Sequence, residues 1–184
     1  MGLADVRAAI IEYLTVNPDG QVPFLNKVFG FPAKFTPEGE IYPQDSPGVQ
    51  SGAVIYLYIG RATDDRVAFG GPHSGRKFRV YEVTLHCLLF SQKPLSQDAG
   101  EDNETFLDGL VTAIRADRTC GTGVAPASPH GDGSGIIDQW GEGGLNGGQD
   151  ILVESFYPQS VAGAQASTLT QSTVKVTVCQ VLAT

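Results

Sequence analysis

The sequence predicts a single α+β domain over residues 1–184, with a mixed or antiparallel sheet flanked by two main helices and a long Gly-rich loop insertion. Two segments repeat apolar residues at helical spacing, and several others alternate or are rich in β-branched residues. A third observation is the run from 121 to 148, which holds ten glycines in 28 residues. A length of 184 residues suits one core, because domains usually contain roughly 100–200 residues.

The two predicted helices lie at the start of the chain and just after residue 100. The first carries a single apolar stripe, made of Leu3, Val6, Ile10, Ile11 and Leu14. We expect it to end before Asn17–Pro18–Asp19–Gly20, because proline blocks helix continuation and glycine accepts a positive φ. The second carries the stripe Phe106, Leu107, Leu110, Val111 and Ile114, and Asp98-x-x-Glu101 before it predicts a capping box.

Strands are predicted from runs of β-branched and aromatic residues. The run 53–59 is bounded and apolar, and the run 77–90 is the strongest β signal, apolar on both faces toward its end. Residues 173–178 alternate valine with polar residues, and we expect their strand to form a hairpin with 150–157. Five prolines between 21 and 50 favour only short edge strands at 22–24 and 28–31.

The glycine-rich segment 121–148 is expected to be an extended loop, and loops of this length in a compact domain are usually functional or disordered. Ile136, Ile137 and Trp140 lie within it, which predicts that part of the loop docks on an apolar surface. Trp140 is the only tryptophan, and two roles fit it equally: an anchor in a protein interface or packing in the core.

The negative charge lies entirely in the second half of the chain. Residues 1–93 carry nine Lys/Arg and nine Asp/Glu, whereas residues 94–184 carry three and eleven, which accounts for the net charge of −8. An acidic half repels phosphate and disfavours nucleic-acid binding unless basic side chains gather locally. One such cluster is predicted at Arg61, Arg66, Arg76, Lys77 and Arg79, and ordinary solvent-exposed charges at loops and strand ends are the alternative.

The sequence contains no recognised catalytic, phosphate-binding or metal-binding motif, so no catalytic residue, cofactor or metal is predicted. His86 and Cys87 are adjacent, but neighbouring strand residues point to opposite faces and do not form a nucleophile and base pair. Hard cations bind carboxylates, which are grouped at Asp64–Asp65 and at Asp98, Glu101, Asp102 and Glu104. The alternative is a turn and a helix N-terminus, where acidic side chains favour the helix dipole.

Cysteine spacing and apolar run lengths bear on the cellular location. Cys87, Cys120 and Cys179 have no metal-ligand spacing, and three cysteines cannot all pair with one another. Cys87 and Cys179 lie in apolar strand-like runs, which predicts buried free thiols and a reducing compartment. No signal-peptide pattern and no apolar run near the ~20 residues of a membrane helix is present, so we expect a cytosolic protein without membrane contact.

The order of the predicted elements, together with two segments, resembles the tail-terminator and tail-completion proteins of long-tailed (siphovirus-type) bacteriophages. The segments are Val80-Tyr81-Glu82-Val83-Thr84-Leu85-His86-Cys87 and the acidic helix from Glu104 to Ile114. The resemblance covers residues 1–116 and the closing hairpin, and the glycine-rich segment departs from it. It implies a non-enzymatic subunit, with a sheet flanked by helices, that forms a hexameric ring at the head-proximal end of the tail tube.

Such a ring caps the tail tube protein, joins the head–tail connector or neck proteins, and lets DNA pass through its lumen without specific binding. The resemblance therefore implies a virion protein that is assembled in the host cytoplasm. An acidic lumen would repel passing DNA weakly and uniformly, and we expect Glu101, Asp102, Glu104 and Asp108 to line it. The expected subunit interface comprises Arg66, Phe69, Ile136, Ile137 and Trp140.

Two other functions are compatible with the sequence. The first is another phage structural subunit, of the tail tube or the neck, which a long hairpin at 61–79 that becomes ordered only on assembly would favour. The second is a small-ligand-binding or enzymatic α+β domain, which a deep pocket that joins His86 or His130 to carboxylates would favour.

Overall fold

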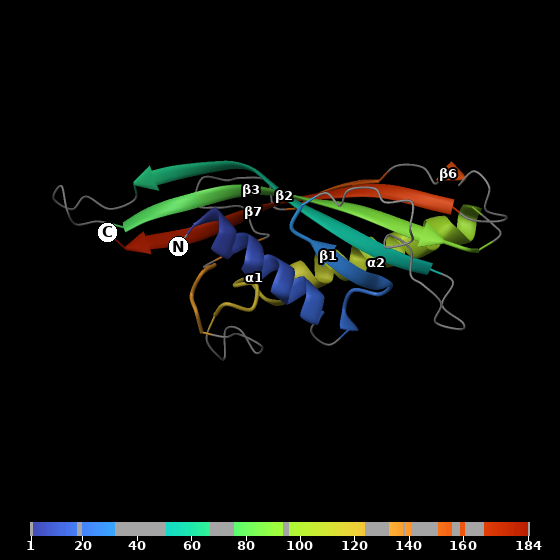
Figure 1. The fold of residues 1–184 in the computed structure, drawn as a ribbon, viewed down its shortest axis with the longest axis horizontal. Coiled ribbons are helices and arrows are strands. Elements are labelled where there is room, and N and C mark those ends of the chain that lie inside the picture. Colours follow the sequence, from blue (N-terminus) through green and yellow to red (C-terminus); the bar gives the residue numbers. More distant parts are fainter. Residues whose placement is uncertain are drawn as a thin grey trace.

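The computed structural model confirms an α+β fold, with two helices on a mixed sheet (Figure 1). It describes residues 2–17, 20–31, 51–66, 76–93, 96–123, 133–137, 139–140, 151–155, 159–160 and 168–183. Most of the predicted glycine-rich loop lies outside these residues, so the loop stays a prediction. Its described parts, at 121–123, 133–137 and 139–140, include the short strand β4 (Gln139–Trp140).

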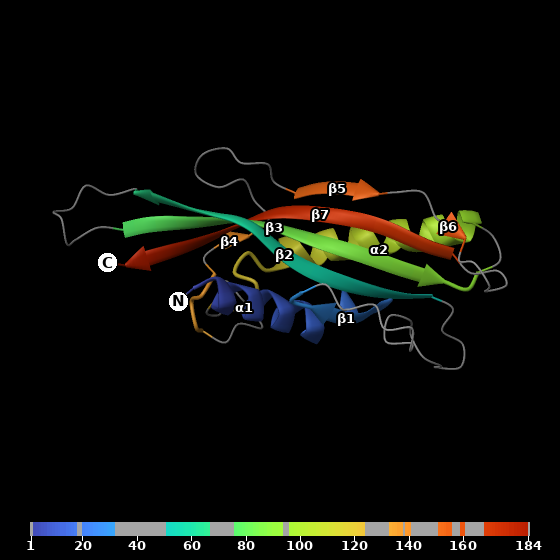
Figure 2. The same ribbon diagram turned by 45° about the horizontal axis from the view of Figure 1, so that its top comes forward.

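The sheet is built around three long strands, β2 (Ser51–Arg66), β3 (Arg76–Ser91) and β7 (Thr168–Ala183), which are antiparallel to one another. The short strand β1 (Leu25–Phe29) adds to β2 in parallel and makes the sheet mixed. The other edge of β7 is shared by β4, β5 (Ile151–Ser155) and β6 (Gln159–Ser160), all antiparallel to it. Figure 2 shows β1 and β5 on opposite sides of the sheet.

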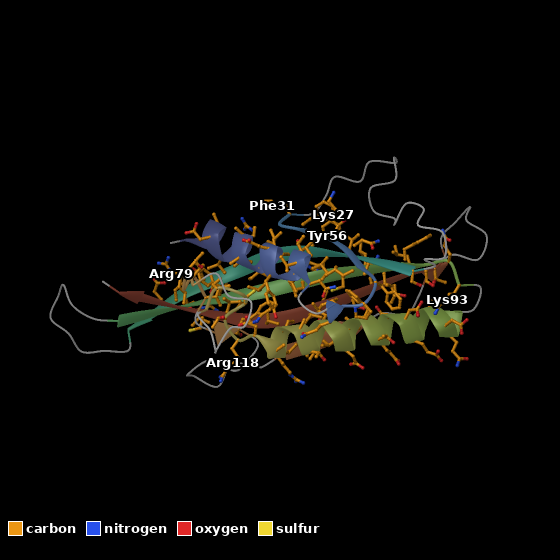
Figure 3. All side chains as sticks on the ribbon, turned by 90° about the horizontal axis from the view of Figure 1, so that it is seen from below. Lys27, Phe31, Tyr56, Arg79, Lys93 and Arg118 are labelled. Carbon is orange, nitrogen blue, oxygen red and sulfur yellow. The ribbon has the colours of Figure 1, made fainter. Side chains whose placement is uncertain are left out.

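Both helices, α1 (Leu3–Val16) and α2 (Ser96–Ala116), lie on the same face of the sheet (Figures 1 and 3). α1 packs on β1 and β2, and α2 packs on β3 and β7. One core fills the space between helices and sheet, and its largest buried side chains include Tyr81, Phe106 and Trp140. Because both helices cover one face, the opposite face has no described helix over it, and we call it the open face.

α1 begins and ends as the sequence predicts. Its buried stripe includes Val6, Ile10 and Leu14, and the backbone N–H of Gly2 donates to the Asp5 carboxylate at 2.7 Å. The helix ends at Val16, and the residue that caps it, Asn17, adopts a left-handed φ of 45°. The Asn17 side chain then closes the turn, because its amide donates to the Val22 carbonyl and its oxygen accepts from the Val22 N–H, both at 2.9 Å.

α2 is the second predicted helix, but its start differs from the prediction. It begins at Ser96, so Asp98 lies within its first turn and the capping box predicted at Asp98 and Glu101 is wrong. Gly109 lets this helix pack closely on the chain before β1. A Cβ there would collide with the Pro23 ring and lie 2.5 Å from the Gln21 carbonyl oxygen.

The strand predictions hold for 77–90 and for the hairpin of β5 with β7. The run 53–59 lies in the first half of β2, which is longer than predicted because it pairs with β3 as far as Arg66, past a bulge between Ile59 and Arg61. The strand predicted at 22–24 is wrong. Pro23 lacks an N–H, and Phe24 has a φ of 62°, so extended pairing in β1 starts only at Leu25.

Candidate functional site

The acidic surface predicted on α2 is formed by three of the four expected residues. Glu101, Glu104 and Asp108 are exposed, whereas Asp102 is buried with 6% of its surface accessible. Asp102 therefore points into the protein and not toward a lumen. It lies four residues before Phe106 and shares its buried stripe, while the three exposed carboxylates lie off that stripe.

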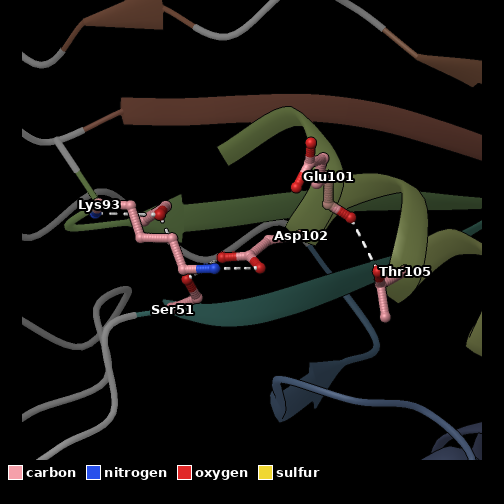
Figure 4. A network of polar contacts seen from close by, with 6 residues as sticks. Ser51, Lys93, Glu101, Asp102 and Thr105 are labelled. Carbon is pink, nitrogen blue, oxygen red and sulfur yellow. Dashed lines mark hydrogen bonds and ion pairs between the residues drawn. The ribbon is translucent and has the colours of Figure 1, made fainter. Parts of the chain in front are cut away.

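Asp102 holds the start of α2 against the sheet through a small polar network (Figure 4). The Ser51 hydroxyl donates to Asp102 Oδ2 at 2.5 Å, and Lys93 Nζ donates to Asp102 Oδ1 at 2.7 Å. The Ser91 hydroxyl, 3.2 Å from the Ser51 hydroxyl, donates to it and joins the ends of β2 and β3. The hydrogen bond to Asp102 raises the pKa of Lys93, so the Lys93 ammonium stays charged at neutral pH. This geometry positions secondary structure and involves no solvent-exposed nucleophile, because Ser51 is buried.

Two of the residues expected in a subunit interface lie in the core of this chain. Ile137 and Trp140 each retain 1% of their accessible surface. The indole N–H of Trp140 donates to the Asp117 carbonyl at 2.8 Å, and its ring packs edge-on to Tyr13, with ring centroids 5.7 Å apart. A side chain with no free surface does not contact another subunit, so the core role of Trp140 is the one observed. The interface role predicted for Ile137 and Trp140 is wrong.

The other expected interface residues have different positions. Ile136 is half-buried and lines an open pocket between α1 and residues 120–122. Arg66 is the last residue of β2, and its side chain is not described. Phe69 lies outside the described residues, as does the turn of the hairpin it was expected to share with Arg66.

The pocket lined by Ile136 has a volume of about 220 Å³. It contains the carboxylates Asp5 and Glu12 and the thiol of Cys120, and none of the described histidines lines it. Burial, and secondarily the charge of Asp117, raises the pKa of Cys120, which keeps its thiol protonated and a poor nucleophile. The pocket joining His86 to carboxylates is not formed, because His86 is exposed on the open face; His130 lies outside the described residues.

The edge of the sheet at β1 carries aromatic and cationic side chains that the sequence reasoning missed. Lys27 Nζ lies 4.8 Å from the centre of the Phe29 ring, and Phe29 stacks on Tyr56 with centroids 5.5 Å apart. Next to this stack, the Arg7 guanidinium lies 4.3 Å from the centre of the Phe31 ring, and Phe31 is 65% exposed. Figure 3 shows Lys27, Phe31 and Tyr56 close together along this edge. The signal was present in the alternation of Lys27, Phe29 and Phe31.

The basic cluster predicted around residues 61–79 is largely neutralised where its side chains are described. Arg79 binds Asp64 through two hydrogen bonds, at 2.5 and 2.7 Å, and these bonds raise its pKa. Arg61 lies 4.0 Å from Glu82 across the β2–β3 pair. These pairs match the alternative of ordinary surface charges, since each cation faces a carboxylate. The side chains of Arg66, Arg76 and Lys77 are not described.

All three cysteines are free and buried, as predicted for Cys87 and Cys179. Within the described part of the chain, no three His, Cys, Asp or Glu side chains come close enough together to hold a metal ion. None of the described helices has the length and apolar character needed to cross a bilayer. No protein-family model matches the sequence, and a search of curated proteins finds no significant match.

Proposed function

We propose that this protein is a structural virion subunit, a tail terminator whose ring caps the tail tube and joins it to the head–tail neck. The observation that carries the proposal is the one-sided sheet: two helices cover one face, and at each side a short strand, β1 or β5, has a described partner on only one of its edges. A subunit with a free strand at each side is suited to head-to-tail association, and rotational symmetry closes such association into a ring.

The charges support a conduit rather than a nucleic-acid binder. The net charge is −8, and the exposed carboxylates of Glu101, Glu104 and Asp108 are aligned on the outer side of α2. Uniform negative charge repels the phosphate backbone without reading its sequence. We propose that these three residues face the channel through which DNA passes, on a ring of six copies assembled in the host cytoplasm.

The first alternative, another tail-tube or neck subunit, uses the same sheet and differs in where the ring sits. The second, a small-ligand-binding or enzymatic domain, requires a pocket with converging titratable groups. The open pocket at Cys120 offers two carboxylates and a protonated thiol, and no observation on it favours a particular ligand.

Location on the tube distinguishes these functions. Gold-labelled protein is added to tubes assembled from the tail tube protein of the same virus and is located by negative-stain electron microscopy. We expect label at one end of each tube, arrest of further growth, and rings whose native mass corresponds to six subunits of 19.5 kDa. Label along the whole tube would identify a tube subunit, and label on no tube would refute the proposal.

A separate variant tests whether the three α2 carboxylates face the channel. Replacing Glu101, Glu104 and Asp108 with Gln, Gln and Asn preserves side-chain size and removes three charges per subunit. We expect rings of these variants to cap tubes normally but to retain double-stranded DNA at low salt, where charge screening is weak. A matched control is the same number of neutral substitutions at Glu12, Asp64 and Glu82, which are exposed and lie on α1, β2 and β3. Equal DNA retention by both triple variants would refute the assignment of the three α2 carboxylates to the channel.

A further inference from the structure

The two outer strands of the sheet have the same length and lie at opposite sides of the molecule (Figure 2). β1 and β5 contain five residues each, and each has a strand partner on one side only among the described residues. A free strand edge presents unpaired N–H and C=O groups and is a template for another strand. The structure therefore offers two strand edges of equal length, and the β1 edge of one copy can pair with the β5 edge of another.

The direction of the two strands is fixed by the pairing inside the subunit. β1 is parallel to β2, and the steps from β2 to β3, from β3 to β7 and from β7 to β5 are each antiparallel. β5 therefore runs opposite to β1. When copies are related by rotation about a common axis, β1 of one copy meets β5 of the next in antiparallel orientation, the arrangement with the better hydrogen-bond geometry.

The side-chain faces of β1 follow from its partners on β2. Val28 pairs with Ile55, which belongs to the core, so Val28 lies on the helix-covered face. Lys27 and Phe29 lie on the open face, and Phe29 stacks there on its partner Tyr56.

The side-chain faces of β5 follow in the same way from β7. Val153 pairs with the core residue Val174 and lies on the helix-covered face, where it is still 39% exposed. Leu152 and Glu154 lie on the open face, and Glu154 there accepts from Lys175 Nζ at 2.9 Å.

We infer that β1 of one copy pairs with β5 of the next copy and continues the sheet from subunit to subunit. Residues that oppose each other in a sheet share a face, so the register must match faces. One antiparallel register also places side chains of complementary charge or apolar character opposite each other. It pairs Lys27 with Glu154, Val28 with Val153 and Phe29 with Leu152. Sliding by two residues keeps the faces but places Lys27 opposite Leu152 or Phe29 opposite Glu154.

The surroundings of the two edges complement each other. The β1 edge carries Lys27 over the Phe29 ring and Arg7 over the exposed ring of Phe31, and arginine and aromatic residues are enriched in protein interfaces. The β5 edge carries Glu154, whose pKa is lowered chiefly by its hydrogen bond from Lys175 and which is therefore charged at neutral pH. A carboxylate has enough acceptor positions for a second cation, so Lys27 adds to the pair and does not displace Lys175.

The register also supplies the stagger that a closed wall of strands requires. Inside one subunit, the row of paired residues that starts at Val28 on β1 continues across the sheet and ends at Ser155 on β5. The residues between them in this row are Ile55, Cys87 and Ser172. The contact with the next copy pairs Val28 with Val153, two residues along β5, or about 7 Å at ~3.4 Å per residue. An even stagger keeps the faces in phase, and a repeated stagger in one direction lets strands tilt and close on themselves.

The pairing of β1 with β5 says how neighbouring subunits of the proposed ring contact each other. It rests on the proposed function only for the closure of the ring, since the same two strand edges would also join copies in an open chain. The test is disulfide trapping between Lys27→Cys and Glu154→Cys in separate copies of the full-length protein. Directly opposed strand residues have Cα atoms within disulfide range, whereas a diagonal neighbour lies roughly 7–8 Å away. The native cysteines are all buried, which keeps the background low.

The matched control pairs Lys27→Cys with Leu152→Cys, which lies on the same face of β5 two residues away. Mixed at high concentration, and also on tube ends, K27C and E154C should form cross-linked dimers under mild oxidation, and K27C with L152C should not. The double variant K27C/E154C should form a ladder of multiples of 19.5 kDa. Charge reversal adds a second readout: K27E alone and E154K alone should each weaken association roughly two- to five-fold, and mixing K27E with E154K should restore it.

The outcomes separate this pairing from the proposed function. Rings on tube ends without the K27C–E154C cross-link would overturn the pairing and leave the terminator proposal intact. Cross-linked open chains that never cap a tube would support the pairing and overturn the terminator. Equal cross-linking to E154C and L152C would also overturn it, since no single register would then exist.

Discussion

Replacing Trp140 tests whether this residue belongs to the core or to an interface. Trp140→Ala removes a side chain that is 99% buried, an edge-to-face contact with Tyr13 and a hydrogen bond to the Asp117 carbonyl, which also accepts from the Cys120 N–H. Large-to-small changes of aromatic core residues cost about 3–5 kcal/mol of the free energy of unfolding. For a chain of this size, about 2–4 °C accompanies each kcal/mol, so Tm should fall by about 6–20 °C.

Trp140→Phe separates packing from hydrogen bonding. It keeps a ring against Tyr13 but removes the indole N–H from the Asp117 carbonyl, which still accepts from the Cys120 N–H at 3.1 Å, so the loss of this one hydrogen bond should cost about 0.5–1.5 kcal/mol. Urea unfolding followed by far-UV circular dichroism measures both variants without depending on tryptophan fluorescence. The control is Val16→Ala, because Val16 is 66% exposed and its loss should change stability by less than about 0.5 kcal/mol. If Trp140→Ala were as stable as this control, the assignment of Trp140 to the core would be refuted.

Three further predictions concern the helices and the thiols. Gly109→Ala should destabilise the protein by about 1–3 kcal/mol because its Cβ meets Pro23 and Gln21, whereas Gly100→Ala, with open space around it, should stabilise by about 0.5–1 kcal/mol in the same urea assay. Asp102→Ala should cost about 1–3 kcal/mol because it removes the acceptor of the hydrogen bonds from Ser51 and Lys93, and a loss no larger than that of Glu101→Ala would contradict the network. Burial raises the pKa of Cys87, so the neutral-thiol contribution is fully present below about pH 8.5, the unfolded value, and the free energy of unfolding should decline as the pH rises above it. Cys87→Ala should flatten that decline, and an unchanged slope would exclude Cys87 as its source.

Local patterns were sufficient to predict the elements that depend on neighbours in sequence. The apolar stripe of α1 and its stop at Asn17 follow from helical periodicity and from proline, both of which act within a few residues. The alternation in β3 predicted that His86 and Cys87 point to opposite faces, and the structure places His86 in solvent and Cys87 in the core. Such features are read from sequence because the geometry of a strand or helix imposes them.

The errors arise where a distant part of the chain determines the environment. Asp102 was grouped with its acidic neighbours, but its spacing of four residues from Phe106 already placed it on the buried stripe, and Ser51 and Lys93 supply its partners. Trp140 is buried because α1 provides Tyr13 and the end of α2 is followed by Asp117, and no local pattern indicates these contacts. The division of the β7 edge among three short strands was likewise not predictable, since it depends on loop paths and not on strand periodicity.

The position of β7 affects how the chain reaches its native state. β7 follows every other described strand in the sequence, yet it lies between β3 and the three short strands. During synthesis on the ribosome, β3 therefore has an unsatisfied side, and β4, β5 and β6 have no strand to join, until residues 168–183 emerge. The nascent chain is consequently most prone to aggregate before residues 168–183 have emerged, and chaperone dependence should be greatest at that stage.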